Sequence, residues 1–313
     1  MPNYLQRILT AAVAIPLIVL ICMKGGLYFF LFVALISALA LIEFYSLVKT
    51  KEAKPLVVLG VISGFFINCS FFAPKLHEII ADALGVSGVP FPTSTQFLLI
   101  TLLLSIAILS LVELFRNNGS AILNLSTTIM GILYIPLFFG AFIGIRELFI
   151  PLDFPFVRFF PNDYGLLNPT NMETAYRWGG YTVISIFAMI WICDSAAYYG
   201  GMMMGKHKLF PRVSPKKSWE GSIFGFIFAI LSAVGAKMLV LPYLTITNAV
   251  VIGFIVGTIG QMGDLVESLI KRDAGVKDSS NLIPGHGGMF DRFDSLLLVA
   301  PIVYLYLDFI VFA

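Results

Sequence analysis

The feature that most constrains this chain is a series of nine apolar stretches, most of them close to the length of a bilayer-spanning helix. Such a helix needs ~20 predominantly apolar residues. Only 12% of the 313 residues are charged, whereas soluble domains carry roughly 25%, so too little polar surface remains to face water. The sequence therefore predicts an all-α fold, a polytopic membrane helix bundle with about nine transmembrane helices.

The predicted spans follow one another along the whole chain: Ile8–Met23, Leu27–Val48, Pro55–Ala73, Phe97–Phe115, Ala121–Phe149, Tyr181–Met204, Trp219–Leu241, Thr247–Ile270 and Ser295–Phe312. The first is short, and the fifth is long and contains Pro136, so we expect it to tilt or kink. We expect one continuous membrane unit. Residues 1–180 would form N-terminal helices with outside loops at 74–96 and 150–180, and residues 181–313 would form catalytic helices and cytoplasmic loops.

The distribution of basic residues predicts the orientation. With the N-terminus inside, 14 of the 20 Lys and Arg residues fall on the inner side and 6 on the outer side. The positive-inside rule then places the N-terminus in the cytoplasm and the C-terminus outside. The two most basic loops, 205–218 and 271–294, share the cytoplasmic face. We expect an integral protein of a bacterial inner membrane, with the lipid bilayer as a partner, and the net charge of +2 gives no reason to expect nucleic acid.

Polar residues stand where the membrane should exclude them. Asp194 lies in the middle of the sixth span, where an aspartate costs ~2.5–3.5 kcal/mol on insertion scales. It could pair with a neighbouring Lys or hydroxyl for packing alone, but by default such a residue faces a polar cavity or the bundle interior. Asp194 is therefore a candidate functional residue.

The loop 205–218 is a second candidate. Its five Lys and Arg residues and two prolines predict a stiff, phosphate-attracting lip, in which Lys216 and Lys217 stand directly before a helix start. Ser218 is placed to cap that helix, with Glu220 in its first turn. The simpler alternative is ordinary positive-inside topology, which would suffice for Lys206 and Lys208.

The eighth span carries acids and a base on one helical face. Asp264, Ser268 and Lys271 are spaced four and three residues apart, with Glu267 beside them. A salt-bridged helix end is the alternative to a functional site. The glycines of this span predict a slim helix that neighbours approach closely, either within the chain or at the seam of a homodimer.

The segment from Gly263 to Asp294 concentrates the remaining charge, with six acidic and four basic residues. Asp291 and Asp294 follow a glycine-rich turn, Gly285–Gly288, whose N–H groups could face phosphate oxygens. Carboxylates with one lone His and no suitably placed Cys favour magnesium over zinc. The residues thus predict a cytoplasm-facing, magnesium-dependent phosphate site for a soluble polyphosphate and a lipid.

The polar positions of this region resemble a family signature. They run from Ser268 to Arg272, then Lys277, Asp278, Ser280, Ile283, Pro284, His286, Gly287, Gly288 and Asp291 to Asp294. The segments Asp194–Tyr198, Gly205–Lys208 and Ser214–Gly221 fit as well. This pattern is similar to that of the phosphatidate cytidylyltransferases (CDP-diacylglycerol synthases), sharply from about residue 190 to 295 and only in topology before that.

The resemblance implies a reaction of CTP with phosphatidate that gives CDP-diacylglycerol and pyrophosphate. It also implies that Asp264 and Asp291 hold Mg²⁺. From their chemistry we infer that Lys277 and Arg292, with Lys216 and Lys217, stabilise the triphosphate. Asp194 and Glu267 are candidates for a second cation or for orienting Lys271. The other candidate substrate-binding residues are Ser214, Ser268, Arg272, Asp278, His286, Gly287, Gly288 and Asp294.

Three alternatives stay open at this point. A CTP-dependent polyprenol or lipid kinase would also be polytopic with a cytoplasmic acid and base site, but it would transfer the γ-phosphate. A transporter of anions would predict inverted repeats with matching broken helices, which the sequence lacks. A structural scaffold would not need Asp194 and Asp264 within its spans.

Overall fold

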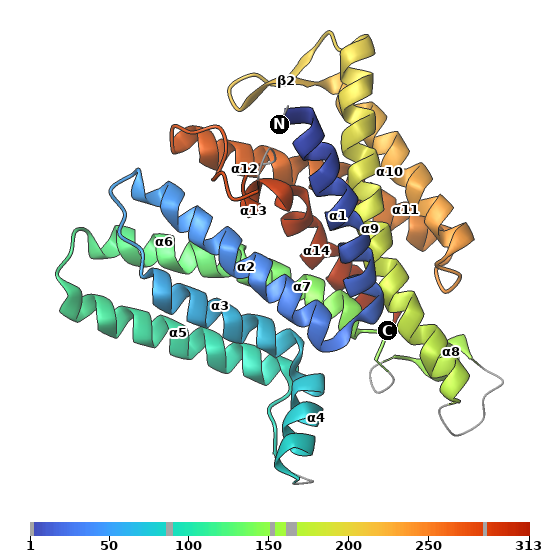
Figure 1. Ribbon diagram of the computed structural model, residues 1–313, viewed down its shortest axis with the longest axis horizontal. Coiled ribbons are helices and arrows are strands. Elements are labelled where there is room, and N and C mark those ends of the chain that lie inside the picture. The colour runs from blue at the N-terminus through green and yellow to red at the C-terminus, as the bar shows by residue number, and fades with distance from the viewer. Residues whose placement is uncertain (1–2, 86–89, 151–153, 161–167, 284–286) are drawn as a thin grey trace. The chain divides into compact units, whose positions relative to one another are not determined.

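The computed structural model describes residues 3–85, 90–150, 154–160, 168–283 and 287–313, and nearly all of its regular structure is helical (Figure 1). The elements are α1 (Asn3–Lys24), α2 (Gly26–Lys49), α3 (Val57–Phe71), α4 (Ala73–Leu84), α5 (Ser94–Arg116), α6 (Ala121–Tyr134), α7 (Pro136–Glu147), α8 (Phe156–Phe159), α9 (Pro169–Met204), β1 (Lys208–Phe210), β2 (Ser214–Ser218), α10 (Trp219–Leu239), α11 (Ile246–Ile255), the π-helix η1 (Val256–Gly260), α12 (Gln261–Asp273), α13 (Met289–Arg292), α14 (Asp294–Tyr306) and the π-helix η2 (Leu307–Val311).

The prediction of a polytopic membrane bundle is confirmed. Among the described residues, seven helices are long and apolar enough to cross a bilayer, and an eighth span is obtained if α3 and α4 count as one. The count of nine is not reached, because the apolar part of α1 is short and α3 has only 15 residues before a bend of 91°. The fifth and eighth predicted spans are each built from successive helical segments, α6–α7 and α11–η1–α12.

Both predicted outside loops are shorter than expected. Residues Ala73–Leu84 form α4, with Pro74 in its first turn, so the helix begins where proline is tolerated best. In the second loop, the Asn168 side chain accepts from Thr170 N, and Pro169 opens the 36-residue helix α9. A proline in the first turn of each helix, joined in the second loop by the Asn168 N-cap, therefore marks a helix start that the hydropathy does not suggest.

The chain divides into two compact units, each assembled from separated segments. The first comprises Met1–Ala12, Gly26–Gly144 and Asp273–Arg292, and the second comprises Val13–Gly25, Ile145–Arg272 and Phe293–Ala313. In the first unit α2, α3, α5 and α6 pack side by side (Figure 1). Ile67, Leu109 and Ile132, from three of these helices, form a buried cluster between them.

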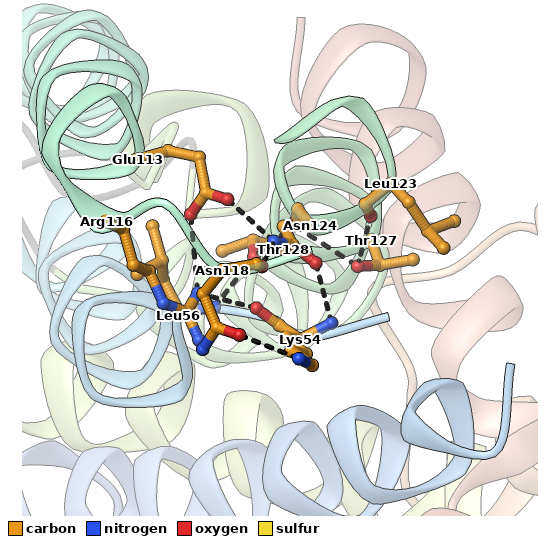
Figure 2. A network of polar contacts seen from close by, with 9 residues as sticks. All are labelled: Lys54, Leu56, Glu113, Arg116, Asn118, Leu123, Asn124, Thr127 and Thr128. Atoms are coloured by element: carbon orange, nitrogen blue, oxygen red, sulfur yellow. Dashed lines mark hydrogen bonds and ion pairs between the residues drawn. The ribbon is translucent and has the colours of Figure 1, made fainter. Parts of the chain in front are cut away.

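A polar network joins the chain segments at one end of these helices (Figure 2). Asn124 is fully buried; its Nδ2 donates to Glu113 Oε1 at 2.6 Å, and its Oδ1 accepts from Lys54 N at 2.7 Å. Arg116 Nη1 donates to the Lys54 carbonyl at 2.6 Å and lies 3.3 Å from Glu113 Oε2. Glu113, the one acid of the fourth predicted span, therefore has a local structural role.

In the second unit α9 and α10 form the most extensive helix pair, and α10 also packs on α11 and η1. At one end of this unit an aromatic cluster includes Phe149, Phe154, Trp178, Tyr243 and Phe312, in which Phe149 and Phe312 lie 5.2 Å apart between ring centroids. Phe154 is buried, so this residue of the Phe-rich region packs inward.

The chief departure from helix is the antiparallel hairpin β1–β2, which follows α9 and precedes α10 (Figure 1). Glu220 fixes its base: Oε2 accepts from Lys206 N at 3.1 Å, and Oε1 lies 2.6 Å from His207 Nδ1. Ser218 Oγ accepts from Gly221 N, so the predicted N-cap of the following helix is confirmed. The predicted basic lip is thus a short hairpin anchored to the first turn of α10.

Candidate active site

Three carboxylates gather in the second unit, on α12 and at the start of α14. One oxygen from each of Asp264, Glu267 and Asp294 lies within 4.8 Å of the others. Glu267 is fully buried, and the two aspartates are half-buried. Carboxylates this close repel one another unless a positive charge or a proton compensates them. Their hard oxygen atoms are the ligands that divalent cations such as Mg²⁺ and Ca²⁺ prefer, so this cluster could hold a metal ion.

A glycine makes this cluster possible. A Cβ at Gly263 would lie 2.7 Å from the carbonyl oxygen of Asp294 and 3.2 Å from the Cα of Ser295. The start of α14 therefore touches the backbone of α12, and this contact brings Asp294 beside Asp264. Of the two uses predicted for the glycines of the eighth span, Gly263 serves packing within the chain.

Two lysines contact the cluster. Lys217 Nζ lies 2.6 Å from Asp264 Oδ2, and Lys271 Nζ lies 2.6 Å from Glu267 Oε2. Ser268 Oγ donates to Asp264 Oδ1 at 3.3 Å. The spacing of three and four residues places these side chains on one side of α12, so the predicted grouping of acids, hydroxyl and base is confirmed. Lys271 is 9% exposed, and a lysine this buried is held by its acidic partner.

The hairpin brings its basic residues to the same unit. Lys217 makes the ion pair with Asp264 described above, while Lys216, its neighbour on β2, is exposed. Arg272, at the end of α12, donates from Nε to the Val213 carbonyl at 3.4 Å, beside half-buried Ser214. Four candidate residues predicted from separate parts of the sequence therefore lie on connected elements.

Asp194, the predicted intramembrane acid, lies in the second unit. It is exposed on α9, in the same unit as Asp264, Glu267 and Asp294. Its functional role therefore stays a prediction, based on its position inside a span.

Gly287 and Gly288, the described residues of the glycine-rich turn, lie in the first unit next to Asp291. Asp291 Oδ2 accepts from Ser279 N and Ser279 Oγ at 2.9 Å and from Gly288 N at 2.8 Å. Gly287 has a φ of 82°, and a Cβ there would lie 2.8 Å from Asp291 Oδ2. Both the positive φ and the close approach favour glycine. The N–H of Gly288, predicted to face phosphate, donates to Asp291 in this structure.

The structure also reveals a residue that the sequence reasoning missed. Glu43, on α2, is 6% exposed and accepts hydrogen bonds from Ser279 Oγ, Ser280 Oγ, Met289 N and Phe290 N. The available signal was its position, since it is the one charged residue of the predicted span Leu27–Val48. An isolated acid in an apolar span is a functional candidate by default.

The remaining candidate residues lie on the first unit or outside the described residues. Lys277, Asp278 and Arg292 are exposed on the first unit, and His286 lies outside the described residues. The predicted metal pair is divided between the units, with Asp264 in the second and Asp291 in the first. Their joint role in holding a cation therefore stays a prediction.

Comparison with known proteins gives a consistent result over the whole chain. A family model described as "Cytidylyltransferase family" matches residues 5–310. A phosphatidate cytidylyltransferase of Synechocystis is 34% identical over 312 residues, which cover 96% of this chain and 95% of that protein. One of Bacillus subtilis is 31% identical over 305 residues, with 96% and 97% covered. A third, of Haemophilus influenzae, is 43% identical over 127 residues, or 39% of this chain.

Proposed function

Because the chain belongs to the cytidylyltransferase family, we propose that it transfers the cytidylyl group of CTP to phosphatidate and forms CDP-diacylglycerol and pyrophosphate. The observation that carries this proposal is the acidic cluster with Lys217 against it, in a membrane chain whose full-length relatives are phosphatidate cytidylyltransferases. Purified protein supplied with phosphatidate, CTP and Mg²⁺ is expected to form CDP-diacylglycerol and pyrophosphate in equal amounts. Failure to form the lipid nucleotide would contradict the proposal.

The reaction asks the protein mainly for positioning and charge neutralisation. A phosphate oxygen of phosphatidate forms a new bond to the α-phosphorus of CTP, and the bond from that phosphorus to the β-phosphate oxygen breaks. Pyrophosphate leaves with that electron pair. The nucleophile is already an anion at neutral pH, so no strong general base is needed. The main barrier is therefore the cost of aligning two mutually repelling anions for attack, and the site has to lower this cost.

Acidic residues would hold the cation that this chemistry needs. Asp264 and Asp291 are the proposed ligands, and the cluster of Glu267 and Asp294 with Asp264 suits a second cation. Bound Mg²⁺ would neutralise triphosphate oxygens and the developing charge on the leaving group. Lys271 stays paired to Glu267, so its proposed task is to hold that carboxylate in place.

Basic residues would bind the triphosphate. Lys217 contacts Asp264 directly, and because its stem is flexible it could move its ammonium from this carboxylate to a phosphate of arriving CTP. Lys216, Lys277 and Arg292 are exposed and available to incoming phosphates. This arrangement would bind CTP more tightly than CDP, because each additional phosphate charge meets a cation.

Replacing Lys216 and Lys217 together by alanine is expected to raise the KM for CTP by roughly ten- to a hundred-fold, with a smaller change in the KM for phosphatidate. A ten- to hundred-fold change corresponds to ~1.4–2.7 kcal/mol. Two charge-assisted contacts supply about this much when solvent weakens each of them, as it does for lysines that are exposed or half-buried. The matched control is Lys206→Ala with Lys208→Ala, which removes the same charge from the same hairpin. If both double variants raise the KM for CTP equally, Lys216 and Lys217 have no specific role in binding CTP.

We further propose that the hairpin faces the cytoplasm in a bacterial inner membrane, with the N-terminus inside and the C-terminus outside. Support comes from the bias of Lys and Arg between alternate connections and from the cytoplasmic origin of CTP. A cysteine-accessibility label or reporter inserted between β1 and β2 is expected to read cytoplasmic. A reporter read from the outer side would overturn the orientation.

A further inference from the structure

The carboxylate of Glu43 is surrounded by donors from a single distant segment. Its Oε1 accepts from Ser280 Oγ at 2.6 Å and from Met289 N at 3.0 Å. Its Oε2 accepts from Ser279 Oγ at 2.8 Å and from Phe290 N at 2.8 Å. Each carboxylate oxygen thus receives one serine hydroxyl and one backbone N–H, from both ends of the loop that contains the glycine-rich turn.

These contacts fix the start of α13, which carries Asp291. Met289 and Phe290 are the first two residues of that helix, and their N–H groups have no partner within a four-residue helix. Phe290 is fully buried and packs its ring 6.2 Å from Phe44, the residue after Glu43, between ring centroids. A polar and an apolar anchor on α2 therefore hold the same two residues.

Ser279 connects Glu43 to Asp291 directly. Its hydroxyl lies 2.8 Å from Glu43 Oε2 and 2.9 Å from Asp291 Oδ2. A hydroxyl has one proton, so it donates to one carboxylate at a time, while Ser279 N also donates to Asp291. A Cβ added at Gly288 would clash with both Ser279 Oγ and Glu43 Oε2, so a glycine at this position leaves room for their contact.

We propose that Glu43 is a positioning residue of the active site, which sets the carboxylate of Asp291 through Ser279 and the start of α13. This inference rests on the proposed role of Asp291 in cation binding. The contacts themselves explain why a charged residue is retained inside an apolar helix, since its cost is offset by four hydrogen bonds. Residues that orient the ligands of a metal typically change metal affinity or activity by about 10–100-fold when replaced.

The test compares Glu43→Gln with Glu43→Asp in the full-length, detergent-purified protein. Glutamine keeps the shape but turns one acceptor oxygen into an NH₂ group that faces an N–H and a hydroxyl. We expect kcat to fall by about 10–100-fold and the Mg²⁺ concentration for half-maximal activity to rise, with the KM for CTP changed less than three-fold. Aspartate keeps the charge and both acceptors, and we expect it to restore at least part of kcat.

Two measurements distinguish a general loss of stability from a failure of the proposed function. Glu113→Gln is the matched control, because Glu113 is also 6% exposed in the first unit and accepts a hydrogen bond from Asn124 on another helix. This variant is expected to lower thermal stability while kcat changes little. Amide exchange of Met289 and Phe290 is expected to speed up in Glu43→Gln only, whatever the enzyme's substrate. Unchanged exchange, or an equal loss of kcat in both glutamine variants, would overturn the inference.

Discussion

Replacing Asp264 by asparagine is expected to lower kcat by on the order of 10³-fold or more, because a cation at a phosphoryl centre supplies several kcal/mol and each 1.36 kcal/mol is a factor of ten in rate. The neutral side chain removes one carboxylate from the group formed with Glu267 and Asp294. It also removes the ion-pair partner of Lys217. The measurement is CDP-diacylglycerol formation by purified protein over a range of Mg²⁺ concentrations.

The control for this variant is Asp273→Asn, which neutralises another acid on the same helix. Asp273 is exposed and pairs with Lys51 at 3.2 Å, so its replacement is expected to leave turnover within about two-fold, as for an exposed ion pair. Turnover near that of the unaltered protein in Asp264→Asn would remove this residue from the cation site.

Replacing Asp291 by asparagine is expected to have an effect of similar size, on the order of 10³-fold in kcat. The variant has two defects. It lacks a proposed cation ligand, and it turns an NH₂ group or a weaker acceptor toward the N–H groups of Ser279 and Gly288. The measurement is kcat together with the thermal unfolding midpoint.

A second variant separates the two defects. Ser279→Ala removes the hydroxyl that bridges Asp291 and Glu43 but leaves both carboxylates in place. It is expected to reduce kcat far less than Asp291→Asn and to retain a clear response to Mg²⁺. If Asp291→Asn folds with an unchanged unfolding midpoint and near-normal turnover, Asp291 is not a cation ligand.

Much of the fold could be predicted from the sequence because a bilayer imposes a length on apolar helices. The main error, in the third span, has a local cause. Pro74 has no N–H to bond the carbonyl four residues before it, so α3 cannot continue through it, and α4 begins with this proline in its first turn. The early start of α9 was also readable, since Asn168 and Pro169 are a typical N-cap and first helical residue.

The candidate site was predictable where its geometry is local. Asp264, Glu267, Ser268 and Lys271 share one helix side because of their spacing, which the sequence displays. Contacts between distant segments were not predictable in this way. Glu43 meets Ser279 across 236 residues, and no periodicity links an acid in one apolar helix to a loop near the other end of the chain.

The partner chosen by Lys217 is another such case. Its basic, proline-flanked loop predicted a phosphate site, and the structure pairs it with Asp264, 47 residues further on. The predicted phosphate site and the observed ion pair are compatible if Lys217 neutralises Asp264 before the substrates bind. What spacing alone could not supply was the hairpin β1–β2, whose antiparallel pairing fixes the position of Lys217 beside α12.

The measurement that tests the central claim most directly follows the two ends of the CTP triphosphate. Purified protein is given phosphatidate, Mg²⁺ and CTP labelled either at the α-phosphorus or at the γ-phosphorus. A cytidylyltransferase is expected to move the α-label into lipid and to release the γ-label as pyrophosphate. Transfer of the γ-label into lipid would contradict this account and identify a CTP-dependent lipid kinase.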